Sequence, residues 1–360
     1  MNKYFRILSI DGGGIRGIIP AQVLVRLEKK LQVKTGIEDA RIADYFDLIA
    51  GTSTGGILTC IYLCPDHTGK KPKFTAEQAV EFYCKYGAKI FKSRWVDFPK
   101  RNVLRYPKYS SSNIEVLLKD HVGDTKLNEL LKPCLITAYD IEARATVFFA
   151  QRDVQKQKKD GNYYVRDVAR ATSAAPTFFP PALIKSDKGK ALPLIDGGVF
   201  ANNPSMCAFA EVRQQFEKKA ADTVMLSLGT GKYYKSYPHK ESQNWGGWQW
   251  VEPLIDIMMS GVSETIDYQM NQLYESVKCS NDDSIEQKCD NDDSTEHPKQ
   301  YLRVNANLPE SSEMDDASEK NIKKLVQLGT EVADEYSSEL DDFVKLLLAQ
   351  TCVGTALNSR

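Results

Sequence analysis

Residues 46–64 read FDLIAGTSTGGILTCIYLC and contain the signal that decides the fold. The apolar run Phe46–Ala50 has the length of a buried strand, and the apolar stretch Ile57–Cys64 continues as a helix. Between them, a glycine-rich segment predicts a tight turn. A membrane span is the alternative interpretation, because the whole stretch is long and nearly uncharged. The glycine turn and Asp47 near its start favour a buried strand, a turn and a buried helix.

The same alternation of strands and helices extends in both directions along the chain. The helix after Pro20 carries Val23, Leu24, Leu27 and Leu31 on one face. Alternating strands and helices form a mostly parallel sheet with helices on both faces, so the sequence predicts an α/β fold. Further strands are predicted at Phe5–Ile10, Cys134–Tyr139, Thr146–Ala150, Leu192–Ile195 and Thr223–Leu228, and helices at 54–64, 75–91, 205–218, 252–275 and 317–348.

No boundary divides this pattern into two folding units, and one domain is expected over residues 1–350. The stretch 278–298 contains a short duplication, KCSNDDSIEQ followed by KCDNDDSTEH. It is acidic and nearly free of aliphatic residues, which predicts a mobile surface insert. A calcium loop is the alternative, but the central glycine of an EF-hand turn is missing. Residues 351–360 are expected to form a disordered tail.

The composition narrows the class of protein. Hydrophobic residues make up 42% of the chain, and 47 Lys and Arg balance 48 Asp and Glu, so the basic excess of a nucleic-acid-binding protein is absent. The eight cysteines show no CxxC pair and no Cys/His metal spacing, which is typical of free thiols in a reducing compartment. No metal or cofactor is expected. The N-terminus lacks a signal-peptide pattern, which predicts a cytoplasmic protein, although export without a signal peptide stays open.

A first glycine-rich turn, Asp11–Gly17, follows the first predicted strand. Consecutive glycines expose backbone N–H groups, and at a strand-to-helix turn these donors can converge on a negative charge. A phosphate fits, and so does the oxyanion that forms during acyl transfer. The turn also matches GxGxxG, and Glu38 or Asp39 lies near the spacing of a ribose partner. A dinucleotide-binding oxidoreductase is therefore one alternative.

A second turn, from Gly51 through Ser53 to Gly55, matches GxSxG in the strand–turn–helix context of a nucleophile elbow. The segments on either side of the serine approach each other closely, so only glycine fits two residues before and two residues after it. The N-terminus of the following helix favours negative charge near the serine. An ordinary helix cap is the alternative.

A serine hydroxyl needs a base to act as a nucleophile. Asp196 ends the predicted strand Leu192–Ile195 and is followed by two glycines, so its carboxylate can approach another backbone closely; an ordinary Asp-Gly turn is the alternative. A poorly solvated carboxylate has a raised pKa and is a better base than a free one. The sequence therefore predicts a Ser53–Asp196 dyad. The four histidines lie in polar contexts without this placement: His67, His121, His239 and His297.

Taken together, these motifs resemble the patatin-like phospholipase family. Its DGGGxRG loop, GxSxG elbow and later DGG appear in order at Asp11–Gly17, Gly51–Gly55 and Asp196–Gly198, and the segments 171–180 and 202–204 are also family-like. The resemblance covers about residues 5–232. It implies a three-layer α/β/α sandwich, a Ser–Asp dyad, no metal, and hydrolysis of acyl esters of phospholipids or other lipids. It also implies an oxyanion hole formed by Gly12, Gly13 and Gly14 and supported by Arg16.

A lipid substrate would require contact with a membrane, and peripheral contact is expected. The aromatic residues of 233–250 are of the kind found at membrane interfaces, although packing beneath a loop is the alternative. The helix face with Met258, Met259, Val262 and Ile266 fits core packing or a lipid lid, and the run Ala174–Phe179 could line an acyl pocket. A non-catalytic lipid-binding protein and a peptidase are the remaining alternatives. The aromatic residues are Tyr233, Tyr234, Tyr237, Trp245, Trp248 and Trp250.

Overall fold

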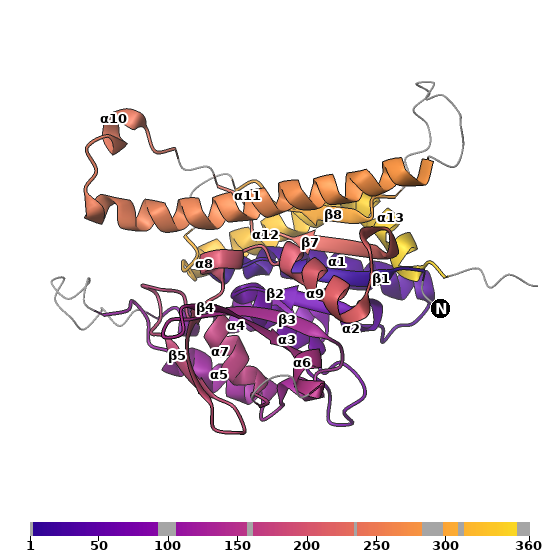
Figure 1. Ribbon diagram of the computed structural model, residues 1–360, viewed down its shortest axis with the longest axis horizontal. Coiled ribbons are helices and arrows are strands. Elements are labelled where there is room, and N and C mark those ends of the chain that lie inside the picture. The colour runs from indigo at the N-terminus through magenta and orange to yellow at the C-terminus, as the bar shows by residue number, and fades with distance from the viewer. Residues whose placement is uncertain are drawn as a thin grey trace, which may run out of the picture.

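An eight-stranded sheet forms the centre of the protein (Figure 1). The structure, a computed structural model, describes residues 3–92, 106–156, 161–233, 236–282, 298–308 and 313–350. The strand order is β5-β6-β3-β2-β1-β7-β8, and β4 pairs with β3. Five neighbouring strands are parallel, namely β3, β2, β1, β7 and β8, whereas β4 and β6 run antiparallel to β3. The strands are β1 Phe5–Ile10, β2 Leu48–Gly51, β3 Cys134–Asp140, β4 Ala145–Ala150, β5 Ala182–Lys185, β6 Ala191–Asp196, β7 Thr223–Leu228 and β8 Tyr301–Val304.

Helices cover both faces of the sheet, as the alternating pattern predicted. The longest, α11, has 36 residues and runs across one face beside α9 (Figure 1). The helices are α1 Ile18–Thr35, α2 Ile42–Tyr45, α3 Thr54–Leu63, α4 Ala76–Ile90, α5 Ser112–Val122, α6 Gln151–Gln155, α7 Val165–Thr172, α8 Gly198–Ala201, α9 Ser205–Phe216, α10 His239–Ser242, α11 Gly247–Asp282, α12 Glu319–Glu335 and α13 Ser337–Leu348.

Side chains that alternate along each strand build two separate cores. Ile7 of β1 and Met225 of β7 point to the face covered by α9 and α11, where they pack with Phe209 and Met270. Their neighbours along the strands point to the opposite face, which is covered by α1, α3, α4, α7 and α12. This two-fold alternation places an apolar layer on each side of the sheet. The α/β fold and its three-layer arrangement are therefore confirmed.

Some sequence predictions differ from the structure. The predicted helix 317–348 is two helices that divide at Tyr336. Residues 278–282, expected in a loop, continue α11, because the helix extends beyond the predicted 275 to Asp282. The rest of the predicted insert, 283–297, and the predicted tail, 351–360, lie outside the described residues. The extent of a single domain over 1–350 stays a prediction. Eight of these helices and strands were not predicted, because they are short or weakly patterned: β5, β8, α2, α5, α6, α7, α8 and α10.

Helix α11 is long but polar on much of its surface. Within the described parts of the chain, no helix is both long and apolar enough to cross a bilayer.

Candidate active site

Ser53 occupies a sharp turn between β2 and α3. Its backbone has φ 55° and ψ −121°, a conformation that non-glycine residues rarely adopt and that commonly marks a functional site. A Cβ atom on Gly51 would collide with the carbonyl oxygen of Gly55, and one on Gly55 would collide with that of Ile10. The turn is therefore possible only with glycine at both positions. The Ser53 N–H donates to the Thr172 hydroxyl at 2.9 Å, which fixes the turn to α7.

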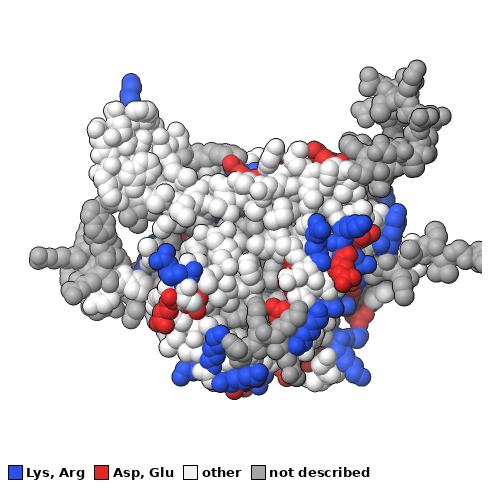
Figure 2. Space-filling model, viewed as in Figure 1, with Lys and Arg blue, Asp and Glu red and all other residues white. Residues whose placement is uncertain are grey.

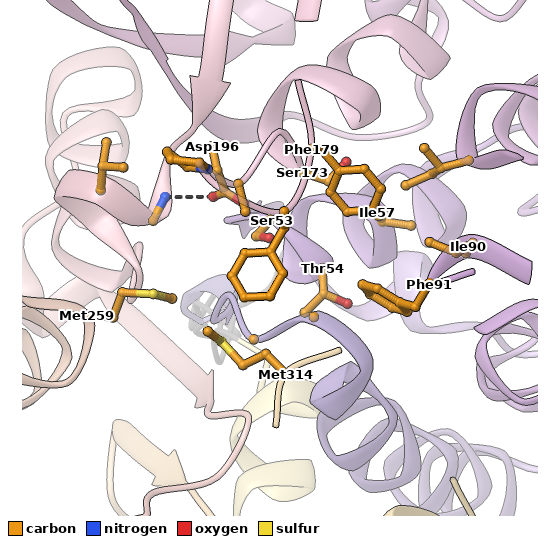
Figure 3. A pocket seen from close by; sticks show the side chains of 18 of the residues that line it. Ser53, Thr54, Ile57, Ile90, Phe91, Ser173, Phe179, Asp196, Met259 and Met314 are labelled. Atoms are coloured by element: carbon orange, nitrogen blue, oxygen red, sulfur yellow. Dashed lines mark hydrogen bonds between the residues drawn. The ribbon is translucent and has the colours of Figure 1, made fainter. Parts of the chain in front are cut away.

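Asp196 lies at the end of β6 and faces Ser53 (Figure 3). Its carboxylate accepts a hydrogen bond from the Gly198 N–H at 2.7 Å, and the Ser53 side chain lies close enough to act on its pKa. Only 4% of Asp196 is exposed. Burial raises the pKa of Asp196 to about 7, although the Ser53 side chain and the Gly198 N–H act in the opposite direction. The structure thus brings together the serine and the carboxylate that the sequence placed 143 positions apart along the chain.

The glycine loop after β1 lies beside this pair, but its three amides are not equivalent. The Gly12 N–H donates to the carbonyl oxygen of Asn202 at 3.0 Å and is already engaged. Gly13 and Gly14 line the same pocket as Ser53 and Asp196, and neither N–H donates to another described residue. The geometry therefore favours Gly13 and Gly14 over Gly12 as donors to an oxyanion.

Two polar side chains orient these amides. The Thr230 hydroxyl donates to the Gly12 carbonyl at 2.6 Å, and the Arg16 Nε donates to the Gly13 carbonyl at 3.5 Å. In a planar trans peptide the N–H points opposite to the C=O. The N–H groups of Gly13 and Gly14 are therefore directed away from Thr230 and Arg16. Thr230 was missed by the sequence analysis, since its role depends on a contact across 218 positions.

Arg16 supports the loop through Gly13 rather than lying in the pocket. Burial lowers the pKa of Arg16 to about 10, against the opposing effect of Asp256 and Glu313. The guanidinium therefore stays protonated at neutral pH and adds positive charge near the proposed oxyanion site.

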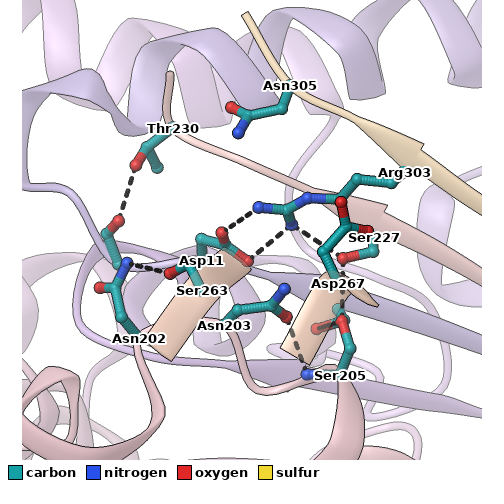
Figure 4. Close-up of polar contacts among 12 residues, drawn as sticks. Asp11, Asn202, Asn203, Ser205, Ser227, Thr230, Ser263, Asp267, Arg303 and Asn305 are labelled. Carbon is teal, nitrogen blue, oxygen red and sulfur yellow. Dashed lines mark hydrogen bonds and ion pairs between the residues drawn. The ribbon is translucent and has the colours of Figure 1, made fainter. Parts of the chain in front are cut away.

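A buried ion pair lies behind the glycine loop (Figure 4). Arg303 of β8 binds both carboxylate oxygens of Asp11, at 2.9 and 2.5 Å, and also donates to the Ser227 hydroxyl at 2.8 Å. Burial disfavours the charged guanidinium, but Asp11 outweighs this effect and raises the pKa of Arg303. This pair anchors the residue that precedes the three glycines. The only sequence signal for it was a single arginine in the short apolar segment 301–304.

The pocket that contains Ser53 is almost entirely apolar (Figure 3). It encloses about 1070 Å³ of space free of protein atoms, including its open mouth. Met258 and Met259 of the predicted helix face line it, whereas Ile266 packs on the core. Its apolar lining consists of Ile57, Phe82, Tyr83, Ile90, Phe91, Ile114, Ala175, Pro176, Phe178, Phe179, Val199, Ile255, Met258, Met259 and Met314.

The other candidate residues lie elsewhere. Asp39, the possible ribose partner, is bound to Lys71 at 2.5 Å in a separate exposed depression. His121 packs against Phe82 and Tyr86 with ring centroids 5.0 Å apart and does not line the pocket. His67 and His239 are exposed, and His297 lies outside the described residues. No group of three or more potential metal ligands occurs among the residues that the structure describes.

The site thus combines a serine on a glycine-flanked elbow with a buried carboxylate and a glycine loop in an apolar pocket. The family model of the patatin-like phospholipases matches residues 8–208. The chain belongs to the patatin-like phospholipase family. Membership supports lipid acyl hydrolase activity and implies lipid substrates.

Relatives match nearly the whole chain. Patatin-like protein 2 of Oryza sativa subsp. indica is 34% identical over 94% of this chain and 86% of its own length. Patatin-like protein 1 of Arabidopsis thaliana is 34% identical over 90% of this chain and 80% of its own. The probable inactive patatin-3-Kuras 1 of Solanum tuberosum is 33% identical over 94% of this chain and 89% of its own. The similarity therefore extends well beyond the three glycine-rich turns.

Proposed function

We propose that the protein is a lipid acyl hydrolase of the phospholipase A type that works through a Ser53–Asp196 dyad and an acyl-enzyme. The observation that carries this proposal is the buried Asp196 carboxylate beside Ser53 in the same apolar pocket, with a pKa raised by burial to about 7. A base of this pKa is matched to neutral pH, because it is substantially ionised and still able to hold a proton.

In the first half of the reaction, Asp196 accepts the Ser53 proton while Oγ attacks the ester carbonyl carbon. The carbonyl oxygen becomes an oxyanion that accepts hydrogen bonds from the Gly13 and Gly14 amides. The intermediate then collapses, the ester C–O bond breaks, and the proton on Asp196 passes to the departing alcohol. For a phospholipid the alcohol is the lysolipid.

In the second half, water donates a proton to Asp196 and attacks the acyl carbon of the Ser53 ester. The bond to Oγ breaks, Ser53 regains the proton, and the fatty acid leaves. No step needs a histidine, since the same carboxylate acts in both halves. Removing one oxyanion donor typically costs about 10²–10³ in rate.

The test compares Ser53→Ala with wild type in lipid-product mass spectrometry on mixed liposomes. We expect Ser53→Ala to release no fatty acid or lysolipid and to lose labelling by a fluorophosphonate probe. Ser173→Ala is a matched control. This serine lines the same pocket, but its hydroxyl donates to the Ala169 carbonyl at 2.8 Å, so its loss should reduce turnover a few-fold at most. Full turnover by Ser53→Ala would exclude the dyad.

We also propose that the protein contacts membranes peripherally through α11. Trp250, Leu254, Ile257 and Met258 are between 38% and 48% exposed and share one helix face. Met258 also lines the pocket, so the exposed face continues into it. Figure 2 shows few charged side chains over α8 and the adjoining part of α11. Trp245 packs between Tyr237 and Trp250, with centroids 5.6 and 5.2 Å away, so part of the aromatic stretch is engaged in packing.

Vesicle flotation tests the membrane proposal. Leu254→Asp should weaken the recovery of protein with phosphatidylcholine vesicles, because a charge would replace an apolar side chain at the bilayer surface. Val33→Asp changes an 86% exposed apolar side chain at the end of α1, on the opposite face of the sheet, and should leave flotation unchanged. Equal flotation by both variants and wild type would contradict the proposal.

A further inference from the structure

The pocket has two sides that differ in burial. On one side, Ile57 of α3 and Phe82 and Ile90 of α4 are 5%, 3% and 4% exposed. On the other, α11 contributes Ile255, Met258 and Met259, and Met258 is 47% exposed. Figure 3 places Ser53 between the two, with Ile57, Ile90 and Phe91 on one side and Met259 on the other. One side is an interior channel, and the other opens to solvent.

The two parts of an ester substrate have different requirements. The acyl chain stays bound to Ser53 after the first half of the reaction, whereas the alcohol must leave. Moving each methylene from water into an apolar channel strengthens binding about fourfold, so a long acyl chain gains most on the buried side. The open side suits a departing alcohol that is still seated in a lipid layer.

Helix α5 forms the far end of the buried channel. It packs on α4 and α7, one layer beyond α3, whose N-terminus carries Ser53. Ile114, in the first turn of α5, is 3% exposed and lines the pocket. Ile57 lies one turn along α3 from Ser53. A chain that extends from Ser53 therefore meets Ile57 first and Ile114 later.

The aromatic wall near this end is held in place. The rings of Phe91 and Phe179 line the pocket, and each has its centroid 5.5 Å from that of Tyr109. The Tyr109 hydroxyl donates to the Asp315 carboxylate at 2.6 Å. Asp315 follows Met314, whose carbonyl accepts the N–H of Ile15 in the glycine loop at 2.8 Å. The channel therefore cannot widen here without breaking a buried hydrogen bond.

We propose that the buried channel receives the acyl chain, that Ile114 is the residue that limits its length, and that the alcohol lies along α11. The assignment of the two sides rests on the proposed function of Ser53 and Asp196. The substrates are then lipids selected by their fatty-acyl chain rather than by a charged head group, because Asp196 is the only charged side chain in the described lining of the pocket.

A series of p-nitrophenyl esters that differ only in acyl chain length tests the proposal. Ile114→Ala should move the preferred chain length up by about two carbons and raise kcat/KM for the longer ester, relative to the wild-type optimum, about tenfold. Ile114→Phe should move the preference towards shorter chains. Both readouts are ratios within one preparation, so the fraction of folded enzyme cancels.

Met258→Ala is the matched control, since it shortens an apolar side chain on the open side. It should leave the preferred chain length unchanged. A shift with Met258→Ala and none with Ile114→Ala would show that the two sides are assigned the wrong way round. An unchanged profile in both Ile114 variants would overturn the proposal. If Ser53→Ala still hydrolyses these esters, the proposed function itself fails, and that outcome is independent of the chain-length profile.

Discussion

Replacing Asp196 with asparagine should remove activity and stabilise the fold, and the size of the stabilisation follows from the burial of the carboxylate. Burial raises the pKa of Asp196 from 3.8 to about 7. At 1.36 kcal/mol per pH unit, the ionised form then costs the folded state about 4 kcal/mol. Asparagine carries no charge, and its Oδ1 can still accept the Gly198 N–H that Asp196 accepts at 2.7 Å.

The sign of the pH dependence is defined by the raised pKa. Below about pH 4, Asp196 is protonated in both the folded and the unfolded chain, and its burial costs no stability. As the pH rises from there to about 7, only the unfolded chain releases this proton, so the free energy of unfolding of the wild type falls. Asp196→Asn should therefore match wild type near pH 4 and gain about 1.4 kcal/mol per pH unit, up to about 4 kcal/mol above pH 7. For a chain of 360 residues, this corresponds to a rise in Tm of roughly 5 °C.

Urea unfolding followed by tryptophan fluorescence, at several pH values between about 5 and 8, measures this difference directly. The comparison is internal, because every other titrating group is shared by the two proteins. A difference in the free energy of unfolding that is the same at pH 5 and pH 8 would refute the reasoning. Burial would then not raise the pKa of Asp196, and the argument that this carboxylate is a suitable base at neutral pH would fail.

Three further predictions concern the same region. If ionised Asp196 is the base, kcat/KM for a chromogenic ester should rise about tenfold per pH unit below pH 7 and level off above it; a flat profile down to pH 5 would contradict this role. Gly55→Ala should destabilise the fold severely, because the added Cβ would overlap the Ile10 carbonyl, whereas Gly36→Ala, at φ 70° with nothing within 4 Å, should cost only about 1–2 kcal/mol in thermal or urea unfolding. Arg303→Met should cost about 3–5 kcal/mol by leaving Asp11 buried and unpaired, and the double variant with Asp11→Asn should recover most of this loss. If the double variant is no more stable than the single one, the unpaired charge is not the cause.

Much of the fold could be predicted because its main elements have strong local patterns. β1 and β7 are continuous apolar runs, and they were predicted with the bounds that they have in the structure. β8 was missed because Tyr301–Val304 is short and contains a charged residue. That residue, Arg303, is tolerated inside the sheet only because Asp11 lies opposite it, 292 positions away. Local pattern cannot report such a partner.

The candidate site divides in the same way. Glycine at 51 and 55 and serine at 53 could be recognised from the sequence, because a strained turn tolerates few residue types and leaves a short signature. Aspartate at 196 could be proposed from its place at the end of a strand, before two glycines. Which of the three loop glycines has a free N–H could not be predicted from the sequence. It depends on the Asn202 carbonyl, which accepts the Gly12 N–H, and on the Thr230 hydroxyl, which donates to the Gly12 carbonyl. The family resemblance implied all three as donors.

By itself, the sequence determined the alternating sheet-and-helix fold, the elbow at Ser53 and the chemical types available to the site. Backbone sterics and apolar periodicity act over a few residues, so a short stretch of sequence is enough to reveal them. The tertiary structure decided the pKa of Asp196, the direction of the free amides, and which side of the pocket is closed. These properties depend on how far distant segments exclude water and supply hydrogen-bond partners, and such exclusion exists only once the chain has packed.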